Sequence, residues 1–443
     1  MAASASAHGD RPRARTSVAD LVRHVGEEVL VEGWLYHRRS SGKVRFVLVR
    51  DGTGIVQGVV AADAETSVFA LADTLPQESS LRMGGKVRAE PRAPGGYELA
   101  VTHLEPIHVP VTPFPIGPKE HGIGFLMDYR HLWIRSRRQT PILRIRDATL
   151  WAIRSFFRER GFVATEAPIL VGTAVEGTTT LFPLDYFGRP AYLSQSGQLY
   201  LEATCAALGK VYWIGPVFRA EKSKTRRHLI EFWMAEAEQA FLDHEGNLAL
   251  QEDLVRYVVE AVVADRPRDL AELERDPALL LEEVRQPFAR LTYAEAVAAV
   301  RNQGVEMEFG DDFGAPAEDA LSRLLGRPVF VERFPAAIKP FYMKRDPEQT
   351  DLVLCADLIA PEGYGEIIGG SQRVDTEEEL LSQLGEAHLP LEPYAWYTDL
   401  RRWGAIPHSG FGLGVERAVQ WLTGIAHIRE AIPFPRTLDR LYP

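Results

Sequence analysis

The chain has 443 residues, a hydrophobic content of 46%, a charged content of 25% and a formal net charge of -11. This length predicts two or three domains, each with its own hydrophobic core, and the composition is that of an ordinary globular protein. The charge argues against a protein that coats nucleic acid without specificity. Two cysteines are too few for a disulfide framework, and no apolar stretch approaches the roughly 20 residues that span a bilayer.

Residues 1–17, "MAASASAHGDRPRARTS", contain no apolar segment of the kind that forms the core of a signal peptide. They predict a disordered, mildly basic tail, with an organellar presequence as the alternative that stays open. We therefore expect a cytoplasmic protein with no membrane partner.

Residues 29–107 are rich in β-branched side chains that alternate with polar ones. The runs "VLVEGWLYHRR", "VRFVLVR" and "IVQGVV" are strand-like, and the last two flank the turn "DGTG" as in a hairpin. Two further runs, "KVRAEPR" and "YELAVTHLEPI", flank a Pro-Gly-Gly turn. The pattern predicts a small barrel of about five strands.

A segment dense in proline and glycine, "PVTPFPIGPKEHGIG", indicates a linker and a domain boundary within residues 110–135. Beyond it, apolar side chains at helical spacing predict one helix that ends at Gly161 and another over 244–263. The proline-punctuated acidic stretch 264–285 is expected to be a surface elaboration.

Strand-like runs recur at 162–170, 327–334, 352–360 and 365–373, and a helix is expected to begin near Gly414. Strands and helices that do not alternate regularly predict an α+β domain built around an antiparallel sheet.

Several common site signatures are missing. The sequence has no Gly-x-x-x-x-Gly-Lys-Ser/Thr phosphate loop and no His-Glu-x-x-His zinc helix. The glycines of "GFGLG" at 410–414 have the wrong spacing for a dinucleotide fingerprint, and no βαβ unit surrounds them.

Positive charge is concentrated in the segment 218–236, "FRAEKSKTRRHLIEFWMAE". Arginine forks bind phosphate oxygens in pairs, and an aromatic ring such as that of Phe232 can stack on a purine. A solvated hairpin with one core phenylalanine is the alternative, since charge runs usually lie at the surface.

Three other segments also suit a binding site. The glycines of "GFGLGVER" allow a close approach of the backbone before Arg417, or form a tight turn packed on a sheet. Asp357 and Glu366 suit magnesium bound to a polyphosphate, or are two surface acids. Polar residues within 174–182 and 194–203 suit an amino acid zwitterion, or merely line turns.

Together and in this order, these segments resemble the class II aminoacyl-tRNA synthetases. "RGFVATEAPIL" is similar to their motif 1, "FRAEKSKTRRHLIEFW" to motif 2 and "GFGLGVER" to motif 3. Within the aspartyl/asparaginyl branch, "LMDYRHLWIR", "YLSQSGQLY", "GYGEIIGGSQR" and "REAIPFPR" resemble signatures of the bacterial asparaginyl-tRNA synthetase family.

The resemblance covers residues 18–443 and implies three parts. An OB-fold anticodon-binding domain is expected over 18–109 and a hinge over 110–135. A class II catalytic domain, with a mostly antiparallel sheet flanked by helices, is expected over 136–443. The implied activity is the ATP-dependent formation of asparaginyl-adenylate, followed by transfer to the 3′ end of tRNA(Asn).

Such a reaction needs no side-chain nucleophile, because the amino acid carboxylate is already ionised; the enzyme positions two anions and offsets charge at the α-phosphate. By resemblance, Arg219 contacts the α-phosphate, Arg417 the γ-phosphate, and Phe232 the adenine ring. The other residues that the resemblance assigns to ATP or Mg²⁺ are Glu221 and His228 for ATP, and Asp357 and Glu366 for the metal.

For the amino acid, the resemblance assigns Glu176 and Gln198 to the α-amino group and Arg373 to a side-chain oxygen. Glu236 accepts from the amide nitrogen, and a carboxylate that only accepts hydrogen bonds repels aspartate. Aspartyl enzymes carry a lysine where this chain has Leu201, so asparagine is the expected substrate. One departure is "EAE" at 236–238, where the family usually reads Glu-Pro-Glu.

For the tRNA, Arg39, Phe46 and Gln57 match the family's anticodon readers in type and spacing. The family is dimeric, and Pro168 of motif 1 is expected at a homodimer interface. The tRNA acceptor end is expected to approach the loop cations Lys222, Lys224, Arg226 and Arg227.

Two other functions stay open. One is a synthetase that also, or instead, charges aspartate. The other is a paralogue that has kept the fold for another purpose, such as an amide-forming ligase or an RNA-binding regulator.

Overall fold

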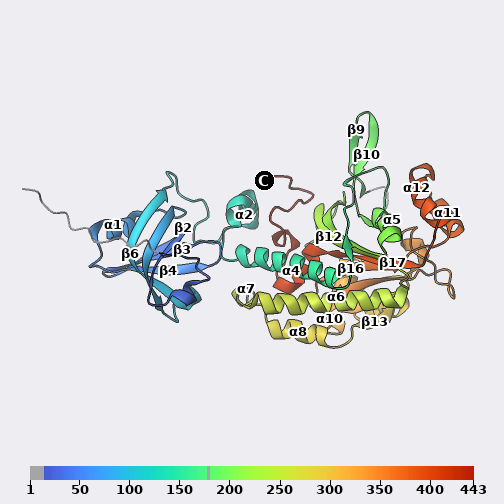
Figure 1. Cartoon of the computed structure of the whole chain (residues 1–443). Coiled ribbons are helices and arrows are strands. Elements are labelled where there is room, and N and C mark those ends of the chain that lie inside the picture. The colour runs from blue at the N-terminus through green and yellow to red at the C-terminus, as the bar shows by residue number, and fades with distance from the viewer. Residues whose placement is uncertain (1–13, 177–179) are drawn as a thin grey trace, which may run out of the picture. The chain divides into compact units, whose positions relative to one another are not determined.

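A computed structural model describes residues 14–176 and 180–443, which fall into two units, 1–126 and 127–443 (Figure 1). Most of the predicted tail, residues 1–13, lies outside the described residues. Ala14–Arg15 form strand β1, which pairs in parallel with the next strand. The prediction of a disordered tail up to residue 17 is therefore wrong for these two residues.

The first unit contains a closed five-strand ring in the order β2-β3-β4-β6-β5, which the pairing of β2 with β5 completes. Inward-facing residues such as Val31, Val47 and Val56 are fully buried, as expected for side chains that alternate across a strand. The barrel prediction is confirmed. Its strands are β2 (Glu28–Ser41), β3 (Val44–Arg50), β4 (Ile55–Val60), β5 (Ser80–Ala89) and β6 (Tyr97–His108).

Helix α1 (Thr66–Thr74) was not predicted from the sequence. It places Val68 and Ala72 in the barrel core. The predicted "DGTG" turn is present, with Gly52 at a φ of +89° and the Asp51 carboxylate accepting from the backbone N–H groups of Thr53 and Gly54. Such a φ favours glycine.

The end of the predicted linker is helical. It contains α2 (Ile123–Asp128) and α3 (Arg130–Trp133). Arg130 is buried and donates to the backbone carbonyls of Ile432 and Pro433 and to the side chain of Gln139. This end of the segment is thus fixed within the second unit.

The second unit is built on an eight-stranded sheet in the order β13-β14-β15-β16-β17-β12-β11-β7. Only the two outermost pairs are parallel, so the prediction of a mostly antiparallel sheet is confirmed. The strands are β13 (Ala289–Thr292), β14 (Val329–Glu332), β15 (Cys355–Ala360), β16 (Gly365–Gln372), β17 (His408–Gly414), β12 (Glu231–Ala240), β11 (Lys210–Phe218) and β7 (Val163–Ala164).

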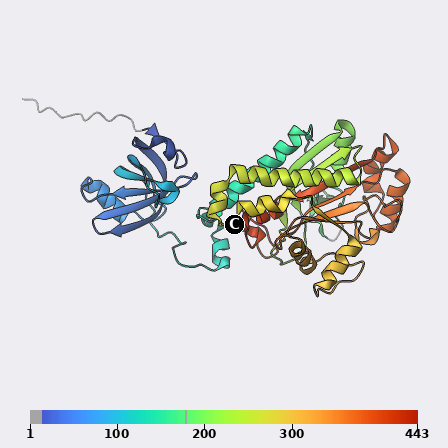
Figure 2. The ribbon, with the colours of Figure 1, turned by 90° about the horizontal axis from the view of Figure 1, so that it is seen from below.

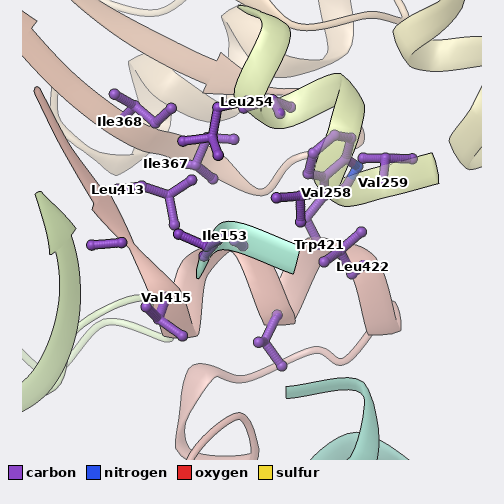
Figure 3. Packing of buried hydrophobic residues seen from close by; sticks show 14 of the residues in the cluster. Ile153, Leu254, Val258, Val259, Ile367, Ile368, Leu413, Val415, Trp421 and Leu422 are labelled. Carbon is purple, nitrogen blue, oxygen red and sulfur yellow. The ribbon is translucent and has the colours of Figure 1, made fainter. Parts of the chain in front are cut away.

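Three helices cover one face of this sheet: α4 (Gln139–Glu159), α6 (His244–Asp265) and α13 (Val415–Thr423). Helices α4 and α6 lie side by side across it (Figures 1 and 2). Figure 3 shows Ile153 of α4, Val258 of α6 and Trp421 of α13 meeting Ile367 and Leu413 of the sheet. All three predicted helices are therefore present.

Two local predictions were wrong. Residues 264–285 are not a mere surface elaboration, because α7 (Pro267–Glu272) and α8 (Pro277–Arg285) each bury a leucine, Leu270 and Leu280, in the main core. The strand expected over 162–170 is reduced to β7, and β8 (Leu170–Val171) joins a separate three-stranded sheet.

The opposite side of the unit carries that small sheet and α5 (Gln198–Leu208). Strands β9 (Pro183–Tyr186) and β10 (Arg189–Leu193) form a hairpin that projects beyond the large sheet (Figure 1). Further α-helices of the described residues are α9 (Tyr293–Asn302), α10 (Ala315–Leu324), α11 (Glu377–Glu386) and α12 (Ala395–Arg402).

Candidate active site

A cavity of about 630 Å³ lies against strand β12. Alternate residues of that strand, from Phe232 to Glu238, line the cavity. Ala235 and Ala237, which lie between them, are buried in the core on the other face. The cavity therefore lies on the sheet face opposite α4, α6 and α13. Every residue that the resemblance assigned to the catalytic domain's substrates lines it: Glu176, Gln198, Arg219, Glu221, His228, Phe232, Glu236, Asp357, Glu366, Arg373 and Arg417.

Arg219 follows β11 directly, and its backbone N–H donates to the carbonyl of Ile230. Its guanidinium carbon lies 5.6 Å from the centre of the Phe232 ring. The nearest guanidinium nitrogen is 3.9 Å from the Glu176 carboxylate, too far for a hydrogen bond. Its Nε is buried without a hydrogen-bond partner among the described residues. This arginine can therefore donate to an anion in the cavity.

Arg417 lies in the first turn of α13 and holds Glu366. Its Nη1 donates to the Glu366 carbonyl at 2.8 Å and to its carboxylate at 2.9 Å. Across the cavity, His228 has its Nε2 3.6 Å from the Glu221 carboxylate. Burial and the positive charge of Arg417 lower the pKa of His228, so the ring is neutral at pH 7 and donates from one nitrogen only.

Two carboxylates, Asp357 of β15 and Glu366 of β16, converge over Gly369. A β-carbon on Gly369 would lie 3.2 Å from Oε1 of Glu366 and 3.6 Å from Oδ1 of Asp357. The second oxygen of each is held by a cation: Lys339 donates to Oδ2 of Asp357 at 2.7 Å, and Arg417 holds Oε2 of Glu366. One oxygen of each carboxylate therefore faces the same space.

The pKa values of Asp357 and Glu366 are shifted in opposite directions. Burial raises the pKa of Asp357 to about 7 despite the neighbouring Lys339. Burial acts in the same direction on Glu366, but Arg417 and Lys339 outweigh it, and the pKa of Glu366 lies below its ordinary value. Converging hard oxygen ligands fit a small divalent cation that keeps most of its waters, such as Mg²⁺.

At the other end of the cavity, two carboxylates lie near the start of α5. Glu176 accepts a hydrogen bond from the Tyr342 hydroxyl at 3.0 Å. Glu236 accepts from the Gly197 backbone N–H at 2.8 Å. Burial raises the pKa of Glu236 to about 7, and hydrogen bonds from Ser196 and Gly197 only partly oppose it. The ionised form of Glu236 is therefore available from about neutral pH upward.

Arg373 is buried, lines the same cavity as Glu236 and is held by Glu238. Its Nε donates to the Glu238 carboxylate at 3.1 Å, and its Nη1 donates to the Ser371 hydroxyl at 2.7 Å. A guanidinium has five N–H groups, so hydrogens remain for a ligand. The cavity thus offers a donor, Arg373, and an acceptor, Glu236, and a neutral carboxamide has one accepting oxygen and one donating nitrogen.

The departure at Ala237 leaves the central strand regular. Strand β12 pairs without interruption with β11 over 231–239 and with β17 over 234–240. Ala237 lies opposite Tyr212 on one side and Phe411 on the other. An alanine has the backbone N–H that a proline lacks, so it suits a strand with neighbours on both sides.

The family description "tRNA synthetases class II (D, K and N)" matches residues 123–438, and "OB-fold nucleic acid binding domain" matches residues 29–107. The chain belongs to the class II aminoacyl-tRNA synthetases. Both predicted domain types, the OB fold and the class II catalytic fold, are thereby confirmed.

Curated relatives agree over nearly the whole length. The "Asparagine--tRNA ligase" of Pelotomaculum thermopropionicum is 57% identical, covering 96% of this chain and 99% of the relative. That of Thermus thermophilus is 56% identical, covering 97% and 100%. The solved asparaginyl-tRNA synthetase of Pyrococcus horikoshii, complexed with asparaginyl-adenylate, superposes with a TM-score of 0.92 at 45% identity and covers 97% of this chain and 99% of that one.

The motif 2 loop of this class II synthetase differs from expectation at one cation. Arg227 is only 5% exposed and is held by Glu318 and Asp319 of α10 and by the Gly363 carbonyl. It is therefore an internal anchor of the loop, and the prediction that it faces the tRNA was wrong. The other three cations, Lys222, Lys224 and Arg226, are exposed; Arg226 pairs with Asp319 and Lys224 with Asp439.

Three residues of the site were not predicted from the sequence: Lys339, Tyr342 and Glu238, which hold predicted residues in place as described above. Glu202, which belongs to the polar cluster predicted within 194–203, lies behind the cavity lining and accepts from Gln198 at 3.0 Å. Only Glu238 carried a usable signal, because it lies two residues from Glu236 and so shares its strand face.

A cluster of His244, Glu245 and Glu332 also has the spacing of a metal site. Arg290 donates to both of its carboxylates, and His244 lies 2.9 Å from Glu332. Internal ion pairing accounts for this cluster without a metal. Among the described residues, no helix has both the length and the hydropathy to cross a membrane.

In the OB-fold unit, the three predicted anticodon residues form one cluster. The Arg39 guanidinium lies 4.4 Å from the centre of the Phe46 ring and donates to the Gln57 side-chain oxygen at 3.0 Å. Gln57 in turn donates to Glu98 at 3.2 Å. Arg39 also lines a surface hollow of about 370 Å³.

Proposed function

We propose that this class II synthetase activates L-asparagine with ATP and transfers it to tRNA(Asn). The observation that carries the proposal is one cavity that contains an arginine whose Nε has no partner among the described residues, two converging carboxylates, and both Arg373 and Glu236. The relatives named as asparagine–tRNA ligases, at 51–57% identity, support it.

Activation consists of positioning two anions, since asparagine supplies its own carboxylate nucleophile. Arg219, with its unpaired Nε, is assigned to the α-phosphate, where negative charge develops. Arg417 is assigned to the terminal phosphate, Phe232 to the adenine ring, and Glu221 with neutral His228 to the remaining polar contacts of ATP. Phosphate binding by Arg417 competes with its present contact to Glu366.

Asp357 and Glu366 are the residues that would hold Mg²⁺, through the two oxygens that converge over Gly369. A bound Mg²⁺ offsets charge on the phosphate oxygens. Lys339 orients Asp357 and partly neutralises the charge of its carboxylate.

For asparagine, Glu176 and Gln198 are assigned to the α-ammonium group. Arg373 donates to the side-chain oxygen and Glu236 accepts from the amide nitrogen. Aspartate would meet Glu236 as a second carboxylate, and like charges in a buried site repel strongly. Leu201 packs in an apolar cluster with Trp213 and Val217 and supplies no cation for aspartate.

Transfer then requires tRNA. We assign Arg39, Phe46 and Gln57 to the anticodon, because an aromatic ring stacks on an unpaired base while arginine and glutamine reach base edges. We also propose a homodimer through motif 1: Pro168 is exposed, and its neighbours Ile169 and Leu170 are 42% and 49% exposed. Cytoplasmic location follows from the proposed role in translation.

The test is ATP–pyrophosphate exchange and tRNA charging, each with asparagine and with aspartate. We expect asparagine to support both reactions and to be preferred by about 10²-fold or more, as expected for a site with a repelling charge. Equal exchange with aspartate would replace the proposal with a relaxed or aspartyl-charging synthetase. Adenylate formation without charging of tRNA(Asn) would instead indicate a repurposed paralogue.

The selection of asparagine over aspartate should depend on pH. The pKa of Glu236 is about 7, so the carboxyl group gains a proton as the pH falls through neutrality and can then donate to aspartate. We expect the ratio of kcat/KM for asparagine to that for aspartate to fall by up to about 100-fold from pH 8 to pH 6, because the ratio of ionised to protonated Glu236 falls about tenfold with each pH unit. Exchange kinetics across this range check it, and a ratio that rises on acidification contradicts it.

A further inference from the structure

A buried carboxylate lies beneath the amino-acid end of the cavity. Glu202 is one helical turn after Gln198 on α5 and is 3% exposed. Its Oε1 accepts from the Gln198 side-chain nitrogen at 3.0 Å, and the Tyr397 hydroxyl lies 2.8 Å from both of its oxygens. Glu202 itself does not line the cavity, so any effect on substrate passes through Gln198.

Two cations hold this carboxylate on its other side. Arg401 donates to Oε2 of Glu202 at 2.5 Å, and His408 Nε2 lies 3.0 Å from the same oxygen. The other ring nitrogen of His408 lies 2.9 Å from the Ile406 carbonyl, so both nitrogens face acceptors and the ring is cationic. Burial would raise the pKa of Glu202, but Arg401 and His408 outweigh it and place that pKa well below its usual range.

An ionised carboxylate only accepts hydrogen bonds, so it fixes which end of its neighbour's amide it meets. Gln198 must present its nitrogen to Glu202, and its oxygen is then left for the cavity. We propose that Glu202 is a positioning residue that orients the Gln198 amide, so that its oxygen meets the α-ammonium group of the amino acid substrate. The inference rests on the proposed assignment of Gln198 to that group.

The Glu202→Gln variant should reverse this orientation. Arg401 and His408 require an oxygen, so the new amide turns its nitrogen toward Gln198, where it meets another nitrogen donor. Gln198 then flips and presents its NH₂ to the substrate ammonium. We expect the KM for asparagine in pyrophosphate exchange to rise by about 10–100-fold, the effect of a misplaced hydrogen bond to a charged group. The KM for ATP should change by less than about threefold.

A substrate analogue separates this role from general damage to the fold. Succinamate is asparagine without its α-amino group, so it makes no contact with Gln198. Its inhibition constant should be the same, within about threefold, in the wild type and in Glu202→Gln, whereas the KM for asparagine rises. The proposal would be overturned if the Glu202→Gln variant bound succinamate and asparagine more weakly by the same factor. It would also be overturned if the variant kept a normal KM for asparagine and lost only its cooperative thermal unfolding.

Two further variants sharpen the result. The double variant Gln198→Glu/Glu202→Gln exchanges the two groups, so the new amide donates to a carboxylate whose second oxygen faces the cavity. It should recover most of the KM lost in Glu202→Gln, which a purely structural role of Glu202 would not produce. Tyr397→Phe removes one donor but leaves Glu202 ionised by Arg401 and His408, and it should raise the KM by less than about threefold.

The Gln198→Ala variant distinguishes the proposed role of Gln198 from that of Glu202. If this variant leaves the KM for asparagine unchanged, the assignment of Gln198 to the ammonium group is wrong. If Gln198→Ala raises the KM but Glu202→Gln does not, only the positioning role of Glu202 fails.

Discussion

The Arg219→Ala variant is expected to lower kcat/KM for ATP–pyrophosphate exchange by about 10³-fold, since a single donor to developing charge in a preorganised site contributes about 3–4 kcal/mol. The nearest carboxylate to Arg219, that of Glu176, lies 3.9 Å away and makes no hydrogen bond with it, and the Arg219 Nε is buried without a partner among the described residues. The structure therefore presents a half-buried cation to the cavity, with hydrogen-bond donors available for an anionic ligand. Its removal takes away attraction for the α-phosphate without leaving a carboxylate unpaired.

Exchange assays and thermal unfolding on the same preparations measure this effect. The loss should appear mainly in kcat, because the charge that Arg219 meets develops in the transition state. The matched control is Arg285→Ala on α8, where Arg285 is exposed, pairs with Glu282 and does not line the cavity. An Arg219→Ala enzyme within tenfold of the wild type would remove Arg219 from the α-phosphate.

The Glu236→Gln variant is expected to lower the selection of asparagine over aspartate by about 10²-fold, or about 2.7 kcal/mol. The carboxylate of Glu236 accepts from the asparagine amide and repels aspartate. A glutamine of the same shape can donate to the aspartate carboxylate instead. Both changes act in the same direction on the ratio of kcat/KM, and the pH dependence of that ratio should disappear with the titrating group.

Exchange kinetics with each amino acid decide the outcome. Glu231→Gln is the matched control, because Glu231 lies on the same strand but does not line the cavity. A variant that loses activity with asparagine and aspartate equally would show that Glu236 meets a group common to both, such as the α-ammonium. Glu236 would then not select the amide.

Much of the site could be predicted because its residues lie close together within short motifs. Phe232 and Glu236 share one strand face, and alternation places both on the same side of the sheet. The two carboxylates over Gly369 come from neighbouring strands joined by a short connection. Motif order then identified the family, and the cavity contains all the residues assigned to ATP, Mg²⁺ and the amino acid.

The features that could not be predicted depend on contacts between residues that lie far apart in the sequence. Arg227 sits in a run of cations and was assigned to the surface, but its partners Glu318 and Asp319 lie more than 90 positions away. Lys339 meets Asp357 only because a loop folds over β15. Burial of Leu270 and Leu280 follows from the docking of α7 and α8 on the core. Such contacts cannot be predicted from local composition.

Strand β12 fixes the distance between the residues assigned to the adenine ring and to the amino acid side chain. Phe232 and Glu236 are four residues apart on one extended strand, so their α-carbons are separated by about 13 Å at roughly 3.3 Å per residue. Inserting one residue between them would turn one of the two side chains into the core. A change of amino acid substrate in this fold is therefore accessible through substitution at Glu236, while the length of this segment is constrained by the distance between the base and the amino acid.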